Sequence, residues 1–251
     1  MKPGLLIALI LCACRSARPS YVPRDAKLLA EPLYFYPSVE PSHHPKAGVF
    51  FIGNDLGFWS PHQRLAERLA SHGYAVVGFD LKSYLDRFPD STILRDSVLA
   101  HDLPLLVKRS LHELGADSVP LVIAGHSFGA DLAFWTEAHS PVPGLVGILA
   151  LGPTKRDHPT VTIRDRVNAG EPTEPGSFAV ADEIREIPLS VKIALLRGAG
   201  DKERASDRAF IAAGANRLTY TVIPFASHSL KSLIIAGPMI ERALDRLVGG
   251  G

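Results

Sequence analysis

The stretch LVIAGHSFGAD at residues 121–131 constrains the fold of this chain more than any other. Four apolar residues run into Gly-His-Ser-Phe-Gly, and the residues from Ala130 onward are mostly small or apolar and suit a helix. The pattern therefore predicts a buried strand, a sharp turn and a helix. A strand and a helix that pack closely at such a turn leave room only for very small residues two before and two after Ser127. Gly125 and Gly129 occupy those two positions.

Ser127 at this turn is a candidate nucleophile. A serine hydroxyl is a weak nucleophile, so it needs a base beside it and backbone N–H groups that receive the developing oxyanion. An elbow between a strand and a helix allows both and holds the hydroxyl clear of neighbouring side chains. On this motif the chain resembles the α/β-hydrolase superfamily. The structural alternative is an N-cap serine that opens an ordinary helix, with the glycines serving a tight turn.

Two residues past later strands are candidates for the base and for the acid that orients it. In α/β-hydrolases these groups follow in the order Ser, Asp or Glu, His, each just past a strand. Asp201 follows the apolar run 191–196 and a Gly-Ala-Gly turn, and His228 follows the run 218–224. We therefore predict that His228 takes the proton of Ser127 and that Asp201 fixes the tautomer of the imidazole.

Other acids and other roles remain open at this point. Glu203 and Asp207 are alternative acids, but they lie one to two turns deeper in the helix expected after Asp201. The structural alternative for Asp201 is the N-cap of that helix. The alternative for His228 is a capping or surface imidazole that opens the last helix.

The loop after the first buried strand is a candidate for part of the oxyanion site. The apolar run 47–53 ends in glycine, and the loop 54–59 follows at its carboxyl end. In α/β-hydrolases the corresponding loop supplies one oxyanion N–H, and the residue after the nucleophile supplies the other. We therefore predict that the backbone N–H groups of Asn54 and Phe128 form the oxyanion hole. The alternative for this loop is a plain connection from strand to helix.

Apolar runs alternate with helical patterns along the chain. The runs lie at 33–36, 47–53, 74–80, 121–124, 144–152, 191–196 and 218–224. Ser60 and Pro61 predict a helix start with Ser60 as the N-cap. The alternation predicts an α/β fold, an α/β-hydrolase fold with a mostly parallel sheet and helices on both faces. A polar segment with prolines and glycines at about 154–181 predicts a short cap insertion.

Length and composition exclude several classes. The 251 residues are enough for one large α/β domain and too few for two with a linker. The 27 basic and 26 acidic side chains give a net charge of +1, which gives no electrostatic reason to expect a nucleic-acid partner. Both cysteines lie near the N-terminus, which excludes disulfides, thiolate metal sites and a cysteine nucleophile from the body of the chain. The sequence indicates no metal, no organic cofactor and no particular oligomeric state.

The N-terminal segment 1–14 predicts a signal peptide with a lipobox. A positive start precedes a short apolar core that is too brief to span a bilayer. The core ends in Leu-Cys-Ala-Cys, which resembles a bacterial lipobox with Cys14 as the lipidated residue. We therefore expect a lipid anchor at Cys14 and a location at the periplasmic face of the cell envelope. The alternative is ordinary signal cleavage nearby. A polar tether over 15–30 and one domain over 31–251 would follow.

Three segments carry a closer resemblance within the superfamily. They are Gly-Asn-Asp at 53–55 before an aromatic residue, VVGFDLKSY at 76–84, and SFGAD at 127–131. Together they are similar to the VirJ/AcvB-type bacterial virulence proteins, and the match covers roughly residues 47 to 135. The resemblance implies an exported protein that hydrolyses an aminoacylated phospholipid, lysyl-phosphatidylglycerol, at the periplasmic membrane face.

These observations favour a serine esterase that forms an acyl-enzyme and acts on a small-molecule or lipid ester. Two alternatives stay open. One is a non-catalytic binding or assembly protein of the envelope that keeps the hydrolase fold, and a complete set of Ser127, Asp201 and His228 argues against it. The other is a peptidase or thioesterase, which would use the same residues on a different carbonyl.

Overall fold

The computed structural model describes residues 21–39, 44–87, 96–158, 171–172, 176–228 and 236–249. The expected signal peptide with Cys14 lies outside the described residues, as do the first part of the expected tether and much of the expected cap.

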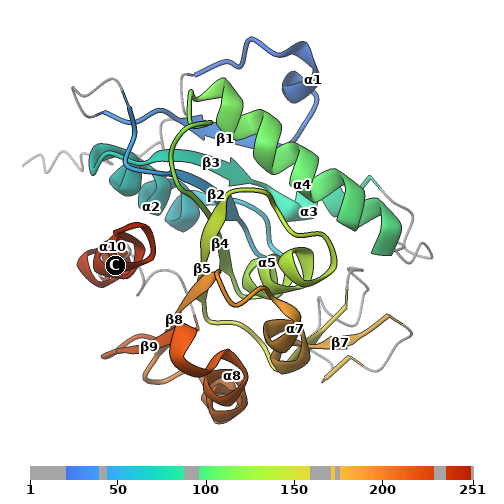
Figure 1. The fold of residues 1–251 in the computed structure, drawn as a ribbon, viewed down its shortest axis with the longest axis vertical. Helices are drawn as coiled ribbons and strands as arrows, with labels where there is room; N and C mark the ends of the chain where they lie inside the picture. Colours follow the sequence, from blue (N-terminus) through green and yellow to red (C-terminus); the bar gives the residue numbers. More distant parts are fainter. Residues whose placement is uncertain are drawn as a thin grey trace, which may run out of the picture.

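Seven strands of the described residues form one sheet (Figure 1). They are β1 (Leu33–Tyr36), β2 (Gly48–Ile52), β3 (Ala75–Phe79), β4 (Leu121–His126), β5 (Leu145–Leu151), β8 (Lys192–Gly198) and β9 (Leu218–Ile223). Their order in the sheet is β1-β3-β2-β4-β5-β8-β9. β1 pairs antiparallel with β3 at one edge, and the other pairs are parallel. The predicted mostly parallel sheet is therefore confirmed.

Helices cover both faces of this sheet (Figure 1). The longer ones are α2 (Ser60–Ser71), α4 (Asp96–Glu113), α5 (Phe128–His139), α7 (Val180–Glu186), α8 (Asp207–Gly214) and α10 (Gly237–Val248). Shorter helical turns are α1 (Ala26–Leu29), α3 (Leu81–Leu85), η1 (Lys202–Ser206) and η2 (Ala215–Arg217). Side chains of α4, α5, α7 and α8 join one apolar core, and those of α2 and α10 join the other.

The two cores follow from the alternation of side chains along each strand. In β2, Phe50 and Ile52 point into the core under α4 and α5, whereas Val49 and Phe51 point into the core under α2 and α10. Strands buried on both faces need continuous apolar runs, and this is why the sequence shows runs rather than alternation.

The start of α2 differs from the prediction by one residue. Ser60 was expected as the N-cap, but it is the first residue of the helix and Trp59 is the N-cap. The reason is the third residue of the helix, because the His62 Nδ1 atom accepts the Trp59 backbone N–H at 3.3 Å. A histidine thus takes the part that glutamate or glutamine plays in a capping box.

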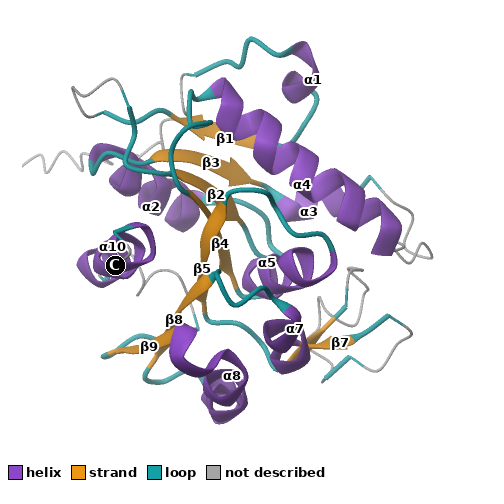
Figure 2. Cartoon of the chain, viewed as in Figure 1, coloured by secondary structure: helices purple, strands orange, loops and turns teal. Residues whose placement is uncertain are grey.

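The segment expected as a short cap contains two short strands, β6 (Arg156–Asp157) and β7 (Phe178–Ala179), which pair antiparallel. Figure 2 shows this pair beside α7. The start of the expected cap segment is hydrogen-bonded to α5. Asp131 of α5 accepts hydrogen bonds from the backbone N–H of Thr154 at 3.0 Å and from the Thr154 hydroxyl at 2.6 Å. Burial raises the pKa of Asp131 to about 7, although the bonds from Thr154 oppose the shift.

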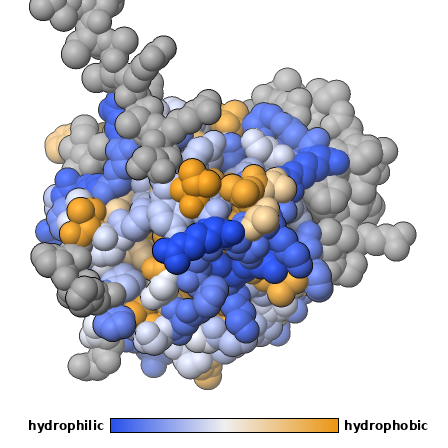
Figure 3. Space-filling view, turned by 90° about the horizontal axis from the view of Figure 1, so that it is seen from above, coloured by the Kyte–Doolittle hydropathy of each residue, from blue (hydrophilic) through white to orange (hydrophobic). Residues whose placement is uncertain are grey.

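Residues 21–30, part of the segment expected as a tether, pack against the domain. Leu28 of α1 is buried in the core with α4, and the Tyr21 hydroxyl donates to a Glu113 carboxylate oxygen at 2.8 Å. On the face shown in Figure 3, apolar side chains form small patches separated by polar ones. No helix in the described part of the chain has the length and apolar character needed to cross a membrane.

Candidate active site

Ser127 lies at the elbow between β4 and α5. Its φ of 53° and ψ of −123° are a strained combination for a residue with a side chain. Backbone hydrogen bonds hold the strained residue in place, because its N–H donates to Leu151 O at 2.9 Å and its carbonyl accepts the Ala130 N–H at 2.8 Å. The elbow predicted from the sequence is present.

The two glycines of the elbow have no room for a side chain. A Cβ atom on Gly125 would lie 2.2 Å from the carbonyl oxygen of Gly129. A Cβ atom on Gly129 would lie 2.2 Å from the carbonyl oxygen of Gly53, at the end of β2. This confirms the prediction that only very small residues fit here. The second contact also places the start of the 54–59 loop against the elbow.

The structure brings together the three side chains that the sequence singled out. The Nε2 atom of His228 lies 2.8 Å from the Ser127 Oγ, and its Nδ1 atom lies 2.9 Å from the Asp201 Oδ2. The three residues follow β4, β8 and β9 at the carboxyl edge of the parallel sheet. Because a carboxylate only accepts hydrogen bonds, Nδ1 carries the proton and Nε2 is free to accept the serine hydroxyl.

Asp201 is held as a buried anion. Its side chain is 1% exposed, and its carboxylate accepts hydrogen bonds from Arg197 Nη1 and from the Glu203 N–H, both at 3.0 Å. Burial alone would raise the pKa of Asp201, but the bonds from His228 and these other donors lower it well below its usual value. The hydrogen bond to Asp201 in turn raises the pKa of His228, against the opposing effect of burial.

Arg197 is a buried residue of the site that the sequence reasoning missed. Its guanidinium is fully buried and joins Asp201 to Asp207, whose Oδ1 atom lies 2.8 Å from Nη2. The same Nη2 atom donates to the Pro153 carbonyl at 2.6 Å. Asp207, an alternative acid in the sequence, therefore supports Asp201 through Arg197. Arg197 directly follows the apolar run 193–196 of β8, but its partners Asp207 and Pro153 are set by the fold.

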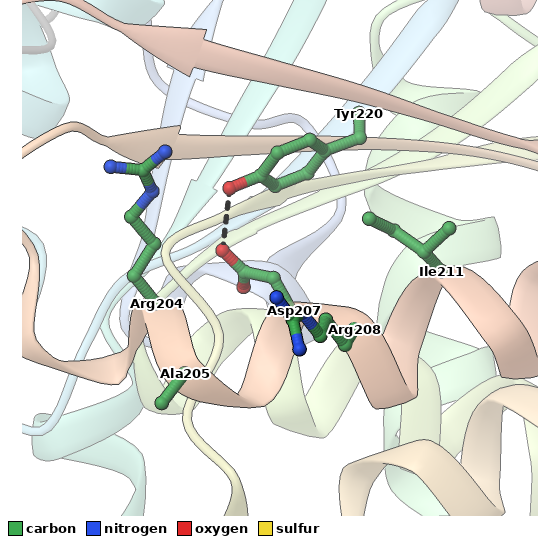
Figure 4. Close-up of a pocket in the computed structure, with 6 residues that line it drawn as sticks. All are labelled: Arg204, Ala205, Asp207, Arg208, Ile211 and Tyr220. Carbon is green, nitrogen blue, oxygen red and sulfur yellow. Dashed lines mark hydrogen bonds between the residues drawn. The ribbon is translucent and has the colours of Figure 1, made fainter.

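A pocket of about 510 Å³ lies beside Asp207, between β9 and the segment formed by η1 and α8 (Figure 4). Its lining residues are Arg204, Ala205, Asp207, Arg208, Ile211 and Tyr220. In Figure 4 the Tyr220 hydroxyl points at the Asp207 carboxylate, to which it donates at 2.6 Å. The pocket lining does not include Ser127 or His228, so it is distinct from the candidate active site.

The expected oxyanion donors lie on the elbow and on the loop beside it. Phe128 is the first residue of α5, so its N–H has no acceptor inside the helix and lies at the positive end of the helix dipole. Asn54 is buried, and its loop is tightly turned, because its side-chain oxygen accepts the Leu56 N–H at 3.1 Å and its carbonyl accepts the Gly57 N–H at 2.9 Å. No group of three or more potential ligands among the described residues could hold a metal ion.

Comparisons with known proteins give structural neighbours only. No protein-family model matches the chain, and no curated protein matches it either. Esterase 2 of Thermogutta terrifontis, phosphonylated by sarin, matches with a TM-score of 0.57 and 20% identity over 86% of this chain and 89% of that one. The esterase domain of a Rhodothermus marinus protein matches with a TM-score of 0.57 and 13% identity over 87% and 98%.

A third similar structure is the thioesterase domain from the curacin biosynthetic pathway. Its TM-score is 0.55 at 16% identity, over 84% of this chain and 94% of that one. Such identities establish the fold and not the activity. Together with the parallel sheet and the strained elbow, they show that this chain has the α/β-hydrolase fold.

Proposed function

We propose that this protein is a serine hydrolase that cleaves a carboxylic ester through an acyl-enzyme. The observation that carries the proposal is the unbroken chain of hydrogen bonds from Ser127 Oγ through His228 to Asp201. A nucleophile, its base and the group that orients the base are thereby within reach of one another.

In the first half of the cycle, the Ser127 Oγ attacks the ester carbonyl carbon while its proton passes to His228 Nε2. The N–H groups of Phe128 and Asn54 would stabilise the tetrahedral oxyanion. The intermediate then collapses, the bond to the alcohol oxygen breaks, and the alcohol leaves with the proton from Nε2. Asp201 stabilises the imidazolium that exists between the two proton transfers.

In the second half, His228 takes a proton from water and the resulting hydroxide attacks the acyl carbon. Collapse of this second intermediate breaks the bond to Ser127 Oγ, which recovers its proton from Nε2. The products are a carboxylic acid and an alcohol. A peptidase or thioesterase would follow the same steps with an amine or a thiol as leaving group.

For the substrate we propose a phospholipid or aminoacyl-phospholipid ester at the cell envelope. Three features support this: the expected lipid anchor at Cys14, the resemblance to the VirJ/AcvB-type proteins, and two apolar side chains on the loops of the site. Leu56, in the loop after Asn54, is 65% exposed, and Phe225, three residues before His228, is fully exposed. Exposed apolar side chains beside a site favour contact with lipid.

Ester hydrolysis by the wild type and Ser127→Ala tests the reaction. We expect the wild type to hydrolyse p-nitrophenyl butyrate and Ser127→Ala to lose at least about 10³-fold in kcat. Ser71→Ala, at an exposed serine, is the matched control and should keep the full rate. Equal rates for Ser127→Ala and wild type would end the proposal. A wild type inactive on esters, thioesters and amides would favour the non-catalytic envelope protein.

Two measurements address the location and the substrate. Labelling with a lipid precursor should mark the wild type but not Cys14→Ser, and equal labelling would contradict the anchor. Lipid extracts of cells with and without the protein should differ in aminoacylated phospholipid. If only other esters accumulate, the aminoacyl-lipid part of the proposal is wrong.

A further inference from the structure

Three histidine rings lie in a row that ends at the Ser127 hydroxyl. The centroid of His126 lies 5.4 Å from that of His62 and 5.6 Å from that of His228. His62 comes from the first turn of α2, and His126 is the last residue of β4, directly before Ser127. Both rings are buried, with 0% and 2% of their surface exposed. The reaction proposed above uses neither of them.

His126 holds the backbone of the proposed base. Its Nε2 atom lies 2.9 Å from the carbonyl oxygen of His228. A carbonyl oxygen can only accept, so Nε2 must carry a proton in this bond. Burial lowers the pKa of His126 to about 4, so the ring is neutral at pH 7 and its Nδ1 atom bears a lone pair. That Nδ1 atom is buried and has no hydrogen-bond partner among the described residues.

His62 has the complementary unpaired atom. Its Nδ1 atom accepts the Trp59 N–H, so Nε2 carries the proton of the neutral ring. Burial lowers the pKa of His62 well below its usual value, which keeps the ring neutral. The Nε2–H group is buried and also has no partner among the described residues. A buried donor and a buried acceptor, both without partners, therefore lie on two adjacent rings whose centroids are 5.4 Å apart.

Burying both atoms without a partner is unfavourable, because each loses its hydrogen bonds to water and gains none, so such pairs normally satisfy one another. We propose that His62 Nε2–H donates to His126 Nδ1, directly after a small ring rotation or through one water. This bond would fix the tautomer in which His126 Nε2–H holds the His228 carbonyl. His62 and His126 are then positioning residues for the proposed base. The catalytic consequence of this inference rests on the proposed function, whereas the proposed hydrogen bond between the two histidines does not depend on it.

The end of β4 positions both the nucleophile Ser127 and, through His126, the backbone of the base His228. His126 and Ser127 are consecutive, so any shift of the end of β4 moves the hydroxyl and the anchor of His228 together. The bond from His126 acts at His228 itself, whereas the Gly200 N–H holds the same loop two residues earlier, at the Ala226 carbonyl. Without the bond from His126, the backbone at His228 would be less firmly placed. The expected loss is therefore in kcat rather than in KM, because substrate binding does not involve either buried ring.

Nitrogen NMR of the full chain with ¹⁵N-labelled histidine tests the tautomers directly. At pH 7.5 we expect both His62 and His126 to be neutral, with Nε2 protonated and Nδ1 accepting. His62→Phe should shift the His126 Nδ1 resonance, because the proposed donor to that atom is lost. Trp59→Phe is the matched control, since Trp59 Nε1 is another buried unpaired donor nearby. A charged His126, a proton on its Nδ1, or a larger shift in Trp59→Phe would overturn the proposal.

Ester kinetics test the positioning role. His126→Leu should lower kcat at least tenfold with KM within twofold, and His126→Gln should recover most of the loss, because its amide nitrogen can replace Nε2–H. His112→Leu, at an exposed histidine, should match the wild type. A folded His126→Leu variant with the wild-type kcat would refute the positioning role, and so would a kcat of His126→Gln no higher than that of His126→Leu. If His126→Leu does not fold, the kcat of His126→Gln and the tautomers seen by NMR decide whether the role holds. An inactive wild type with the expected tautomers would refute the proposed function and leave the hydrogen bonds standing.

Discussion

The Ser127 Oγ and the His228 Nε2 lie 2.8 Å apart, although 101 positions separate the two residues in the chain. Two buried strands of the sheet, β5 and β8, lie between the strands that precede them. The contact therefore depends on how the loop after β9 returns across the sheet edge. Asp201 holds the side chain of His228 from that loop, and His126 holds its backbone.

The first prediction concerns the pH dependence of ester hydrolysis. The reaction needs neutral His228, and its raised pKa means that activity is lost as the pH falls through a value above the ordinary 6.5. In Asp201→Asn the hydrogen bond that raises this pKa is weakened, so the acid limb should move to lower pH. We also expect kcat to fall about 10⁴-fold, because the imidazole loses its tautomer. A pH–rate profile of both proteins checks this, and an acid limb that stays in place would contradict it.

The second prediction concerns the buried ion pairs. Arg197→Met leaves Asp201 and Asp207 without their shared cation, so the free energy of unfolding should fall by about 3–5 kcal/mol. Urea unfolding measures this change. Arg185→Met is the control, because Arg185 makes an exposed pair with Asp182 one helical turn away, and the loss should stay within about 0.5 kcal/mol. Equal losses in the two variants would show that the buried network does not stabilise the fold.

The third prediction separates lack of space from backbone strain. Gly129→Ala places a methyl group against the carbonyl of Gly53, so it should cost about 3 kcal/mol of stability and abolish ester hydrolysis. Gly115→Ala meets no atom within 4 Å but has a φ of +68°, and should cost only about 1 kcal/mol with full activity. If the two variants were equally stable and active, the close packing of the elbow would not matter.

The fourth prediction concerns the apolar side chains on the loops of the site. The double variant Leu56→Ser and Phe225→Ser should weaken binding to phospholipid vesicles at least about tenfold, since burying such a side chain contributes about 1.5–3 kcal/mol. Hydrolysis of a soluble short ester should stay within twofold of wild type. Leu189→Ser is the control, because Leu189 is exposed but lies before β8, at the opposite edge of the sheet. Unchanged vesicle binding in the double variant would count against a lipid substrate.

Much of the fold could be predicted because the central strands are buried on both faces. Such strands must be apolar throughout, and the runs at 47–53, 74–80 and 144–152 mark β2, β3 and β5 closely. The elbow was equally clear, since the close contact of β4 and α5 requires both of its glycines. Asp201 and His228 followed from their positions just after strands, which parallel strands bring to one edge.

The supporting residues could not be predicted, because their roles depend on contacts across the fold. Arg197 lies in a strand, and nothing near it in the sequence indicates that it faces Asp207 rather than solvent. His62 and His126 are 64 positions apart in the printed sequence, and only the packing of α2 against the end of β4 brings their rings together. The helix start at Ser60 was wrong by one residue for a local reason, because the His62 side chain accepts the Trp59 N–H and makes Trp59 the cap.

The most direct test that Ser127 is an activated nucleophile is covalent labelling by a fluorophosphonate, followed by mass spectrometry of the intact protein and its peptides. We expect one adduct per chain, located on Ser127, in the wild type. We expect no adduct in Ser127→Ala and slow labelling in His228→Ala, where the base is lost. Stoichiometric labelling of another residue, or no labelling of the folded wild type, would show that Ser127 is not an activated nucleophile.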